Sequence, residues 1–158
     1  MGAVVALVTS CIQIYSLSYM AHDASKARFF AFLAFFEWSM LSLVYAANLL
    51  QLFIFWELVG LASFFLIGFW YEKPSAVRAA KKAFMMTRIG DVGLFIGLVL
   101  LFMATGSLDV LGINATFDAA GLPATIDKDR VEWIAMLLFI GVIGKSAQFP
   151  LHTWLPDA

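Results

Sequence analysis

Charged residues and cysteine are both scarce in this chain of 158 residues. Only 13% of its residues are charged, whereas a soluble domain has about 25%. The 10 basic and 11 acidic residues give a net charge of −1, which argues against a nucleic-acid partner held by a basic surface. The single cysteine, Cys11, excludes a disulfide framework and a metal or iron–sulfur site built from several cysteines.

Hydrophobic residues are abundant instead, at 63% of the chain, and the mean hydropathy is +0.91. A transmembrane helix needs about 20 consecutive apolar residues, and the long apolar runs do not alternate with polar residues as membrane β-strands do. The sequence therefore predicts an all-α polytopic membrane protein, with about five transmembrane helices in a single membrane region. The predicted helices cover residues 1–21, 29–47, 49–71, 83–105 and 131–148.

Basic residues gather in two of the connections between these runs. They are Lys26 and Arg28 after the first run, and Lys73, Arg78, Lys81 and Lys82 after the third. If every run crosses the membrane, both connections lie on one side, and an excess of lysine and arginine marks the cytoplasmic side. We expect the N-terminus and the largely acidic connection before the fifth run to lie on the other side.

Four ionisable residues fall near the middle of the predicted bilayer, where a charge costs roughly 3 kcal/mol on insertion scales. They are Glu37, Glu57, Asp91 and Lys145. Arg88 lies one helical turn before Asp91, so the two can pair on one helix face. These charges form either buried ion pairs that fix helix packing or a row of protonatable groups that gain and lose partners.

Glu37 is the least expected of these residues, because its neighbours Phe36 and Trp38 suggest no polar path beside it. This setting favours a structural role for Glu37. Thr9, Gln13 and Ser16 form a polar stripe on the first helix, which we interpret as a packing surface in preference to a water path.

The fifth run contains a helix-breaking pattern beside its lysine. Pro150 lacks an N–H and would clash with the carbonyl of the residue four positions earlier, and Gly144 weakens the same stretch. We expect the helix to break just after Lys145, so that freed carbonyls face the ammonium group, as at ion sites in transporters. The alternative is a proline that simply ends the helix at the membrane surface. His152 follows the break, either as a proton relay or as an interfacial histidine.

Four segments, in this order, resemble one known family. They are Phe55–Gly60, Phe65–Trp70, Lys82–Asp91 and Gly144–Ala158. Together they resemble the antiporter-like subunit 5, also called subunit L, of proton-pumping NADH:quinone oxidoreductase, or respiratory complex I. The resemblance covers nearly the whole chain from about Arg28 onward, and it implies that the predicted helices correspond to about the third to seventh transmembrane helices of a longer subunit.

The resemblance also implies roles for the charged residues. Lys145 would carry the proton, Glu57 would tune the charge of that lysine, and Asp91 with Arg88 would form a supporting polar pair. Glu37 stands where the family usually has an apolar residue, so the resemblance gives it no role.

The resemblance further implies that this chain holds no cofactor and no metal, and that NADH, flavin, iron–sulfur clusters and quinone belong to partner subunits. Its expected partners are other membrane subunits and the lipid bilayer, without nucleic acid. The expected location is the bacterial cytoplasmic membrane or its organellar equivalent.

The sequence therefore predicts a membrane subunit that translocates protons, driven by electron transfer in partner subunits. Two related alternatives share the motifs: the large subunit of a multi-subunit sodium/proton antiporter, and the membrane subunit of an inorganic-carbon uptake complex. A third alternative is a helical scaffold whose charges only hold subunits together.

Overall fold

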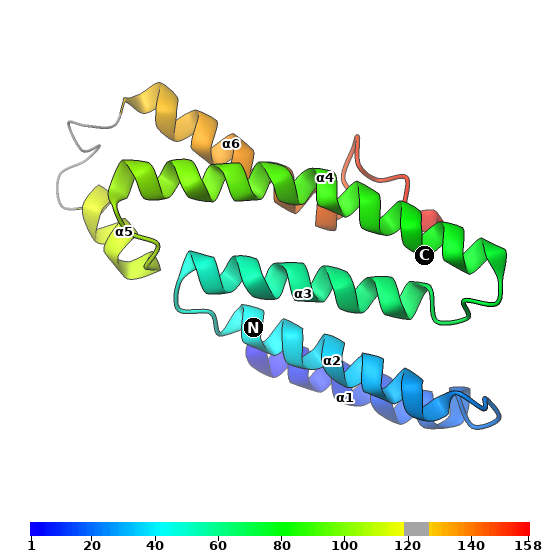
Figure 1. Cartoon of the computed structure of the whole chain (residues 1–158). Coiled ribbons are helices and arrows are strands. Elements are labelled where there is room, and N and C mark those ends of the chain that lie inside the picture. Colours follow the sequence, from blue (N-terminus) through cyan, green and yellow to red (C-terminus); the bar gives the residue numbers. More distant parts are fainter. Residues whose placement is uncertain (119–126) are drawn as a thin grey trace.

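The computed structural model describes residues 1–118 and 127–158, and their secondary structure is helical (Figure 1). The elements are α1 (Gly2–Tyr19), α2 (Lys26–Val44), α3 (Leu49–Ile67), α4 (Pro74–Thr105), α5 (Val110–Asp118), α6 (Lys128–Lys145) and the short 3₁₀ helix η1 (Leu155–Asp157). No strand forms within these two described ranges. The prediction of an all-α membrane fold is confirmed.

Four helices, α1 to α4, are long and apolar enough to cross a membrane. The fifth predicted span is different, because α6 opens with Lys128, Asp129, Arg130 and Glu132 and ends at Lys145. Among the described residues, α6 is therefore not one of the helices whose length and composition alone suit a membrane span.

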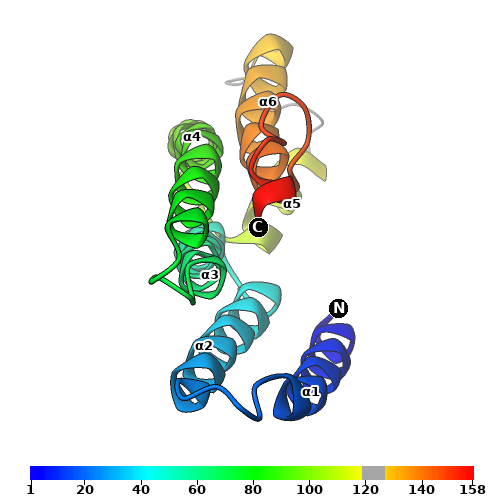
Figure 2. The same cartoon turned by 90° about the vertical axis from the view of Figure 1, so that its right-hand side faces the viewer.

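The helices pack in the order α1, α2, α3, α4, α6, each against its neighbour (Figures 1 and 2). Neighbours α2, α3 and α4 alternate in direction, so the α1–α2 and α3–α4 connections lie at the same end of the bundle. A hydrogen bond joins these connections, from the Trp70 indole N–H to the Asp23 carboxylate at 3.0 Å. This bond holds the pKa of Asp23 below its usual value. The two basic connections thus share one end, as predicted.

Several helix boundaries differ from those predicted. α2 begins at Lys26 and ends at Val44, α3 ends at Ile67, and α4 begins at Pro74 instead of residue 83. Proline suits the first helical turn because its missing N–H would have no intrahelical partner there. Arg78, Lys81 and Lys82 therefore lie on α4 itself and not in a loop. The sequence analysis also missed α5, within the connection that it left without structure.

Helices α4 and α6 approach closely because glycines line their contact. A Cβ atom on Gly90 would lie 3.0 Å from the Cα atom of Gly144, and a Cβ atom on Gly93 would lie 2.8 Å from the side chain of Ile140. Gly97 faces Leu138 in the same way. Small residues allow such backbone approach between membrane helices. The glycine stripe of α4 is thus a helix contact, and it brings the end of α6 beside the middle of α4.

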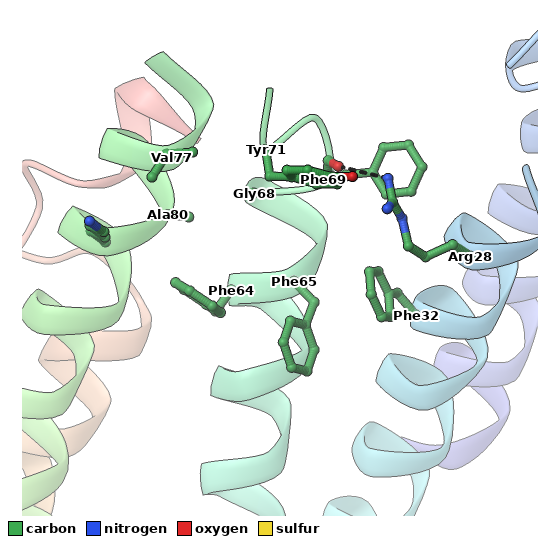
Figure 3. A pocket seen from close by; sticks show the side chains of 10 residues that line it. Arg28, Phe32, Phe64, Phe65, Gly68, Phe69, Tyr71, Val77 and Ala80 are labelled. Atoms are coloured by element: carbon green, nitrogen blue, oxygen red, sulfur yellow. Dashed lines mark hydrogen bonds between the residues drawn. The ribbon is translucent and has the colours of Figure 1, made fainter. Parts of the chain in front are cut away.

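A cavity of about 260 Å³ lies between α2, α3 and α4, near the end that carries the basic connections (Figure 3). Its walls are mainly aromatic and include Phe32, Phe64 and Phe65. Arg28 donates a hydrogen bond to the carbonyl of Phe69 at 3.4 Å, and its guanidinium lies over the Phe69 ring. The cavity contains none of the carboxylates predicted to lie at mid-membrane, so the candidate site lies elsewhere in the bundle.

Candidate functional site

Four charged side chains from three helices form a continuous row inside the bundle. Arg88 of α4 forms an ion pair with Glu57 of α3, and the same Arg88 Nη1 lies 3.8 Å from Asp91 Oδ2. Lys145 Nζ, at the end of α6, lies 3.6 Å from that same carboxylate oxygen. The order is therefore Glu57, Arg88, Asp91, Lys145, with negative and positive charges alternating.

Local helix geometry and glycine packing together assemble this row. Arg88 and Asp91 are three residues apart on α4, which places them on one face. The close contact of Gly90 with Gly144 brings the next residue of α6, Lys145, against that face. The row carries two positive and two negative charges, and such compensation is what makes buried charges tolerable in a medium of low dielectric constant.

Asp91 is the centre of the row, and its side chain is only 3% exposed. One carboxylate oxygen, Oδ1, accepts a hydrogen bond of 2.7 Å from the indole N–H of Trp56 on α3. The other oxygen, Oδ2, faces both Arg88 and Lys145. Asp91 therefore links the two cations, and any change at one of them alters the field at the other.

Lys145 lies in a gap that α3 leaves open. A Cβ atom at Gly60 would collide with Lys145 Nζ, and the ring of Trp56 lies 5.9 Å from the same nitrogen. A distance of 3.6 Å to Asp91 is longer than a hydrogen bond, and within the described residues neither Lys145 Nζ nor Asp91 Oδ2 has a hydrogen-bond partner. Electrostatic attraction, without a hydrogen bond, therefore holds this pair together.

The helix break lies directly after the lysine. α6 ends at Lys145, and Ala147 has a φ of 49° in the turn that follows. The freed carbonyl of Gly144 accepts a hydrogen bond of 3.1 Å from the indole N–H of Trp154. Gly144 is itself helical and contacts Gly90, so it contributes to helix packing, and the turn begins at Ser146, after Lys145. Pro150 lies five residues beyond Lys145, in the turn.

Two further candidate residues are Glu57 and His152. Arg88 lies between Glu57 and Lys145 and pairs with Glu57, so the row links Glu57 to the lysine through Arg88 and Asp91. His152 is exposed, with its ring packed on Phe149, so the structure does not bring it into the row.

Glu37 also lies apart from the row, on the face of α2 that meets α1. It accepts hydrogen bonds from Thr9 and Gln13, two members of the polar stripe predicted on the first helix. A polar partner for Glu37 thus exists after all, supplied by the helix that precedes it in the chain.

The sequence analysis missed two residues of the site, Trp56 and Gly60. They lie one turn apart on α3 and flank the position of Glu57. At this spacing, an indole provides a hydrogen-bond donor and a glycine provides open space on the same helix face. Beside a glutamate within an apolar run, this pattern is the sequence signal for the two residues. Among residues 1–118 and 127–158, no three histidine, cysteine, aspartate or glutamate side chains gather as they would around a metal ion.

Apolar helices of spanning length and a buried row of compensated charges define a polytopic membrane protein with an intramembrane ionic site, a class that includes transporters and pumps. Residues 46–158 match the family described as NADH:quinone oxidoreductase/Mrp antiporter, TM, and residues 1–30 match the N-terminus of NADH-ubiquinone oxidoreductase (complex I) chain 5. The chain belongs to the NADH:quinone oxidoreductase/Mrp antiporter family.

Similar proteins occur in photosynthetic organelles. The chain is 50% identical to the chloroplast NAD(P)H-quinone oxidoreductase subunit 5 of Piper cenocladum, over 93% of this chain and 20% of that protein. It is 49% identical to the chromatophore subunit 5 of Paulinella chromatophora, over 100% of this chain and 24% of that protein. The subunit 5 of Cicer arietinum is 47% identical over 100% of this chain and 21% of that protein. The chain thus spans between a fifth and a quarter of these relatives.

Proposed function

We propose that this chain forms part of a proton-translocating membrane subunit of NADH:quinone oxidoreductase, and that Lys145 carries the proton. The observation that carries the proposal is the continuous row from Glu57 through Arg88 and Asp91 to Lys145. Lys145 lies beside a helix end and is held by electrostatic attraction, without a hydrogen bond from its ammonium to any described residue. Such a lysine can release its proton to water when the charges around it change.

Arg88 supplies the means to change that field, because it lies between two carboxylates. The row starts neutral, with two charges of each sign. When Glu57 takes up a proton it stops holding Arg88, and the row has a net charge of +1. Arg88 then moves toward Asp91, Asp91 holds Lys145 less strongly, and Lys145 releases a proton to water. This release restores neutrality, which favours the step in a medium where an unbalanced charge is costly.

In this proposal the chain contributes no redox centre. Electron transfer from NADH through flavin and iron–sulfur clusters to quinone takes place in partner subunits, and other membrane subunits transmit its energy to the row. The names of the relatives, subunits of NAD(P)H-quinone oxidoreductase, support this assignment.

The end of the bundle with the basic connections faces the cytoplasm or its organellar equivalent. Cysteines introduced as Lys73→Cys and Asp127→Cys, with Cys11 replaced by serine, test this sidedness. They should react with a membrane-impermeant reagent from opposite faces of the membrane, and reaction from one face would contradict the proposed topology.

The decisive test compares Lys145→Met with Lys145→Arg in the complete subunit, assembled in its complex. Proton uptake and quinone reduction are measured together in membrane vesicles. We expect both variants to assemble and both to lose most proton uptake per electron, because methionine holds no proton and arginine, with a pKa above about 12, does not release one.

The matched control is Lys81→Met, an exposed lysine near the basic end of α4, which should pump as the unaltered complex does. If Lys145→Arg pumps normally and only Lys145→Met fails, Lys145 is a fixed charge and the proposed proton transfer does not pass through it.

The description of the matched family supports one other function, antiport of sodium and protons. The two functions differ in what drives them. A quinone-site inhibitor should stop proton uptake in the oxidoreductase, whereas an antiporter would continue to exchange protons for sodium along an imposed sodium gradient.

A further inference from the structure

Glu37 occupies a second intramembrane site, between α2 and α1, whereas the charged row lies between α3, α4 and α6. Thr9 Oγ1 lies 2.8 Å from Glu37 Oε1, and Gln13 Nε2 lies 2.5 Å from Glu37 Oε2. Each carboxylate oxygen therefore has a partner, and both partners are neutral. In the part of the chain that the structure describes, Glu37 forms no ion pair.

The hydroxyl of Thr9 has more than one acceptor within reach. It lies 2.8 Å from the carbonyl of Val5 and 2.8 Å from Glu37 Oε1, yet a hydroxyl has a single proton to donate and can also accept. When Glu37 is ionised, the hydroxyl donates to the carboxylate. When Glu37 is protonated, Glu37 donates to Thr9, and Thr9 donates to Val5.

Both protonation states of Glu37 therefore have a complete set of hydrogen bonds. The amide of Gln13 donates to Oε2 in either state, and only the hydroxyl of Thr9 turns. A carboxylate held by a cation lacks this property, because the ion pair stabilises only the charged form. Thr9 is 5% exposed, and both acceptors already lie within hydrogen-bond distance of its hydroxyl. The switch between the two protonation states therefore requires a rotation of that hydroxyl and no movement of a helix.

Charged and titratable groups on the neighbouring helices do not oppose this switch. α1 has no charged side chain, and its titratable residues Cys11, Tyr15 and Tyr19 are exposed. On α2, Lys26 and Arg28 lie in the first turn, more than two turns from Glu37. On α3, Glu57 is engaged by Arg88.

We propose that Glu37, Thr9 and Gln13 form a second proton-binding site that works independently of Lys145. One proton from water binds the Glu37 carboxylate to give a carboxylic acid, and the same proton returns to water when the acid ionises. The bilayer disfavours the charged form of a carboxyl group, whereas the hydrogen bonds from Thr9 and Gln13 favour it. The site goes beyond the proposed function, since it needs neither the charged row nor electron transfer.

Infrared difference spectroscopy between acidic and alkaline pH tests this site in the complete subunit within its complex. The unaltered protein should show a carboxylic-acid C=O band that disappears as the pH rises. Glu37→Gln, which keeps the shape and one hydrogen bond, should lose that band. Thr9→Val should shift its frequency, because the hydrogen bond to the acid is gone, and Thr9→Ser should restore it. The matched control is Glu72→Gln, an exposed carboxylate in the α3–α4 connection, which should leave the band in place.

Three results would overturn the proposal: difference spectra of Glu37→Gln identical to those of the unaltered protein, no response to Thr9→Val, or a carboxylic-acid band that is lost when sodium is added at a fixed pH. The last would assign the site to sodium. The measurement is separate from pumping, so normal pumping by Lys145→Met would reject the proposed function and leave this test intact.

Discussion

The two intramembrane sites of this chain hold their carboxylates in opposite ways. In the row formed by α3, α4 and α6, Glu57 and Asp91 meet cations. Between α1 and α2, Glu37 meets only a hydroxyl and an amide. A charge balanced by another charge depends on its neighbour's state, so the row couples its members. A carboxylate held by neutral donors has no charged partner that responds to its state, which makes the proposed Glu37 site a local one.

Helix packing also differs between the two sites, because it is tight around the charged row and loose around Glu37. α4 and α6 contact each other through glycines, so their backbones nearly touch. α1 has few buried residues, namely Gly2, Thr9 and Ser16, and most of its apolar side chains are exposed. The row is thus built on a tight helix contact that sets distances between charges, whereas the Glu37 site depends on two side-chain hydrogen bonds. Four predictions test the charged row, which is the coupled side of this comparison, from the largest expected effect to the smallest.

Gly90→Leu should have the largest effect, because the leucine side chain would meet the backbone of α6. A leucine side chain here would force two backbones in contact apart, and a close-packed interior has little room for such a shift. We expect loss of proton uptake and a large drop in the amount of assembled complex, measured on native gels. Ile89→Leu is the control, because Ile89 is 55% exposed; an equal drop there would show that α4 tolerates no change at all.

Asp91→Asn should come next, because it leaves Arg88 and Lys145 without their shared carboxylate. Removing one member of a buried ion pair costs about 3–5 kcal/mol, so assembly should fall and pumping should stop. The double variant Asp91→Asn with Lys145→Met restores charge balance. It should recover assembly without pumping, and failure to recover would mean that the loss of assembly does not come from unbalanced charge.

Gly60→Ala should reduce pumping several-fold while assembly stays normal, because the new methyl group displaces the ammonium of Lys145. The flexible lysine side chain can move aside, so the fold is spared. The ratio of protons taken up to quinone reduced is the measurement, and Ile54→Ala on the exposed side of α3 is the control. An unchanged ratio would show that the position of the ammonium is not critical.

Trp56→Phe should have the smallest effect. It removes the indole N–H that donates to Asp91, and loss of such a bond to a charged group costs about 1.5–3 kcal/mol. We expect a moderate decrease in proton uptake, with Trp38→Phe as the control, because Trp38 is 52% exposed and takes no part in the row. Equal effects of the two changes would assign the loss to aromatic packing.

Local patterns in the sequence were enough to predict the helical class, the pairing of Arg88 with Asp91 and the end of α6 beside Lys145. Each of these depends on residues within a few positions of one another: apolar runs, a spacing of three on one helix, and a lysine with glycine before it and proline after it. The start of α4 at Pro74 has a local signal too, the proline itself, but the basic residues that follow it are equally typical of a loop.

Only the tertiary structure decided which helix faces met. It placed Arg88 between Glu57 and Lys145, made Gly60 the space for the lysine ammonium, and gave Glu37 its partners Thr9 and Gln13. The reason is physical: the period of a helix fixes which residues share a face, but the rotation and level at which two helices pack depend on side chains far apart in the chain. The sequence by itself determined which charges are buried, and the packing of α1 to α6 decided which of them are coupled.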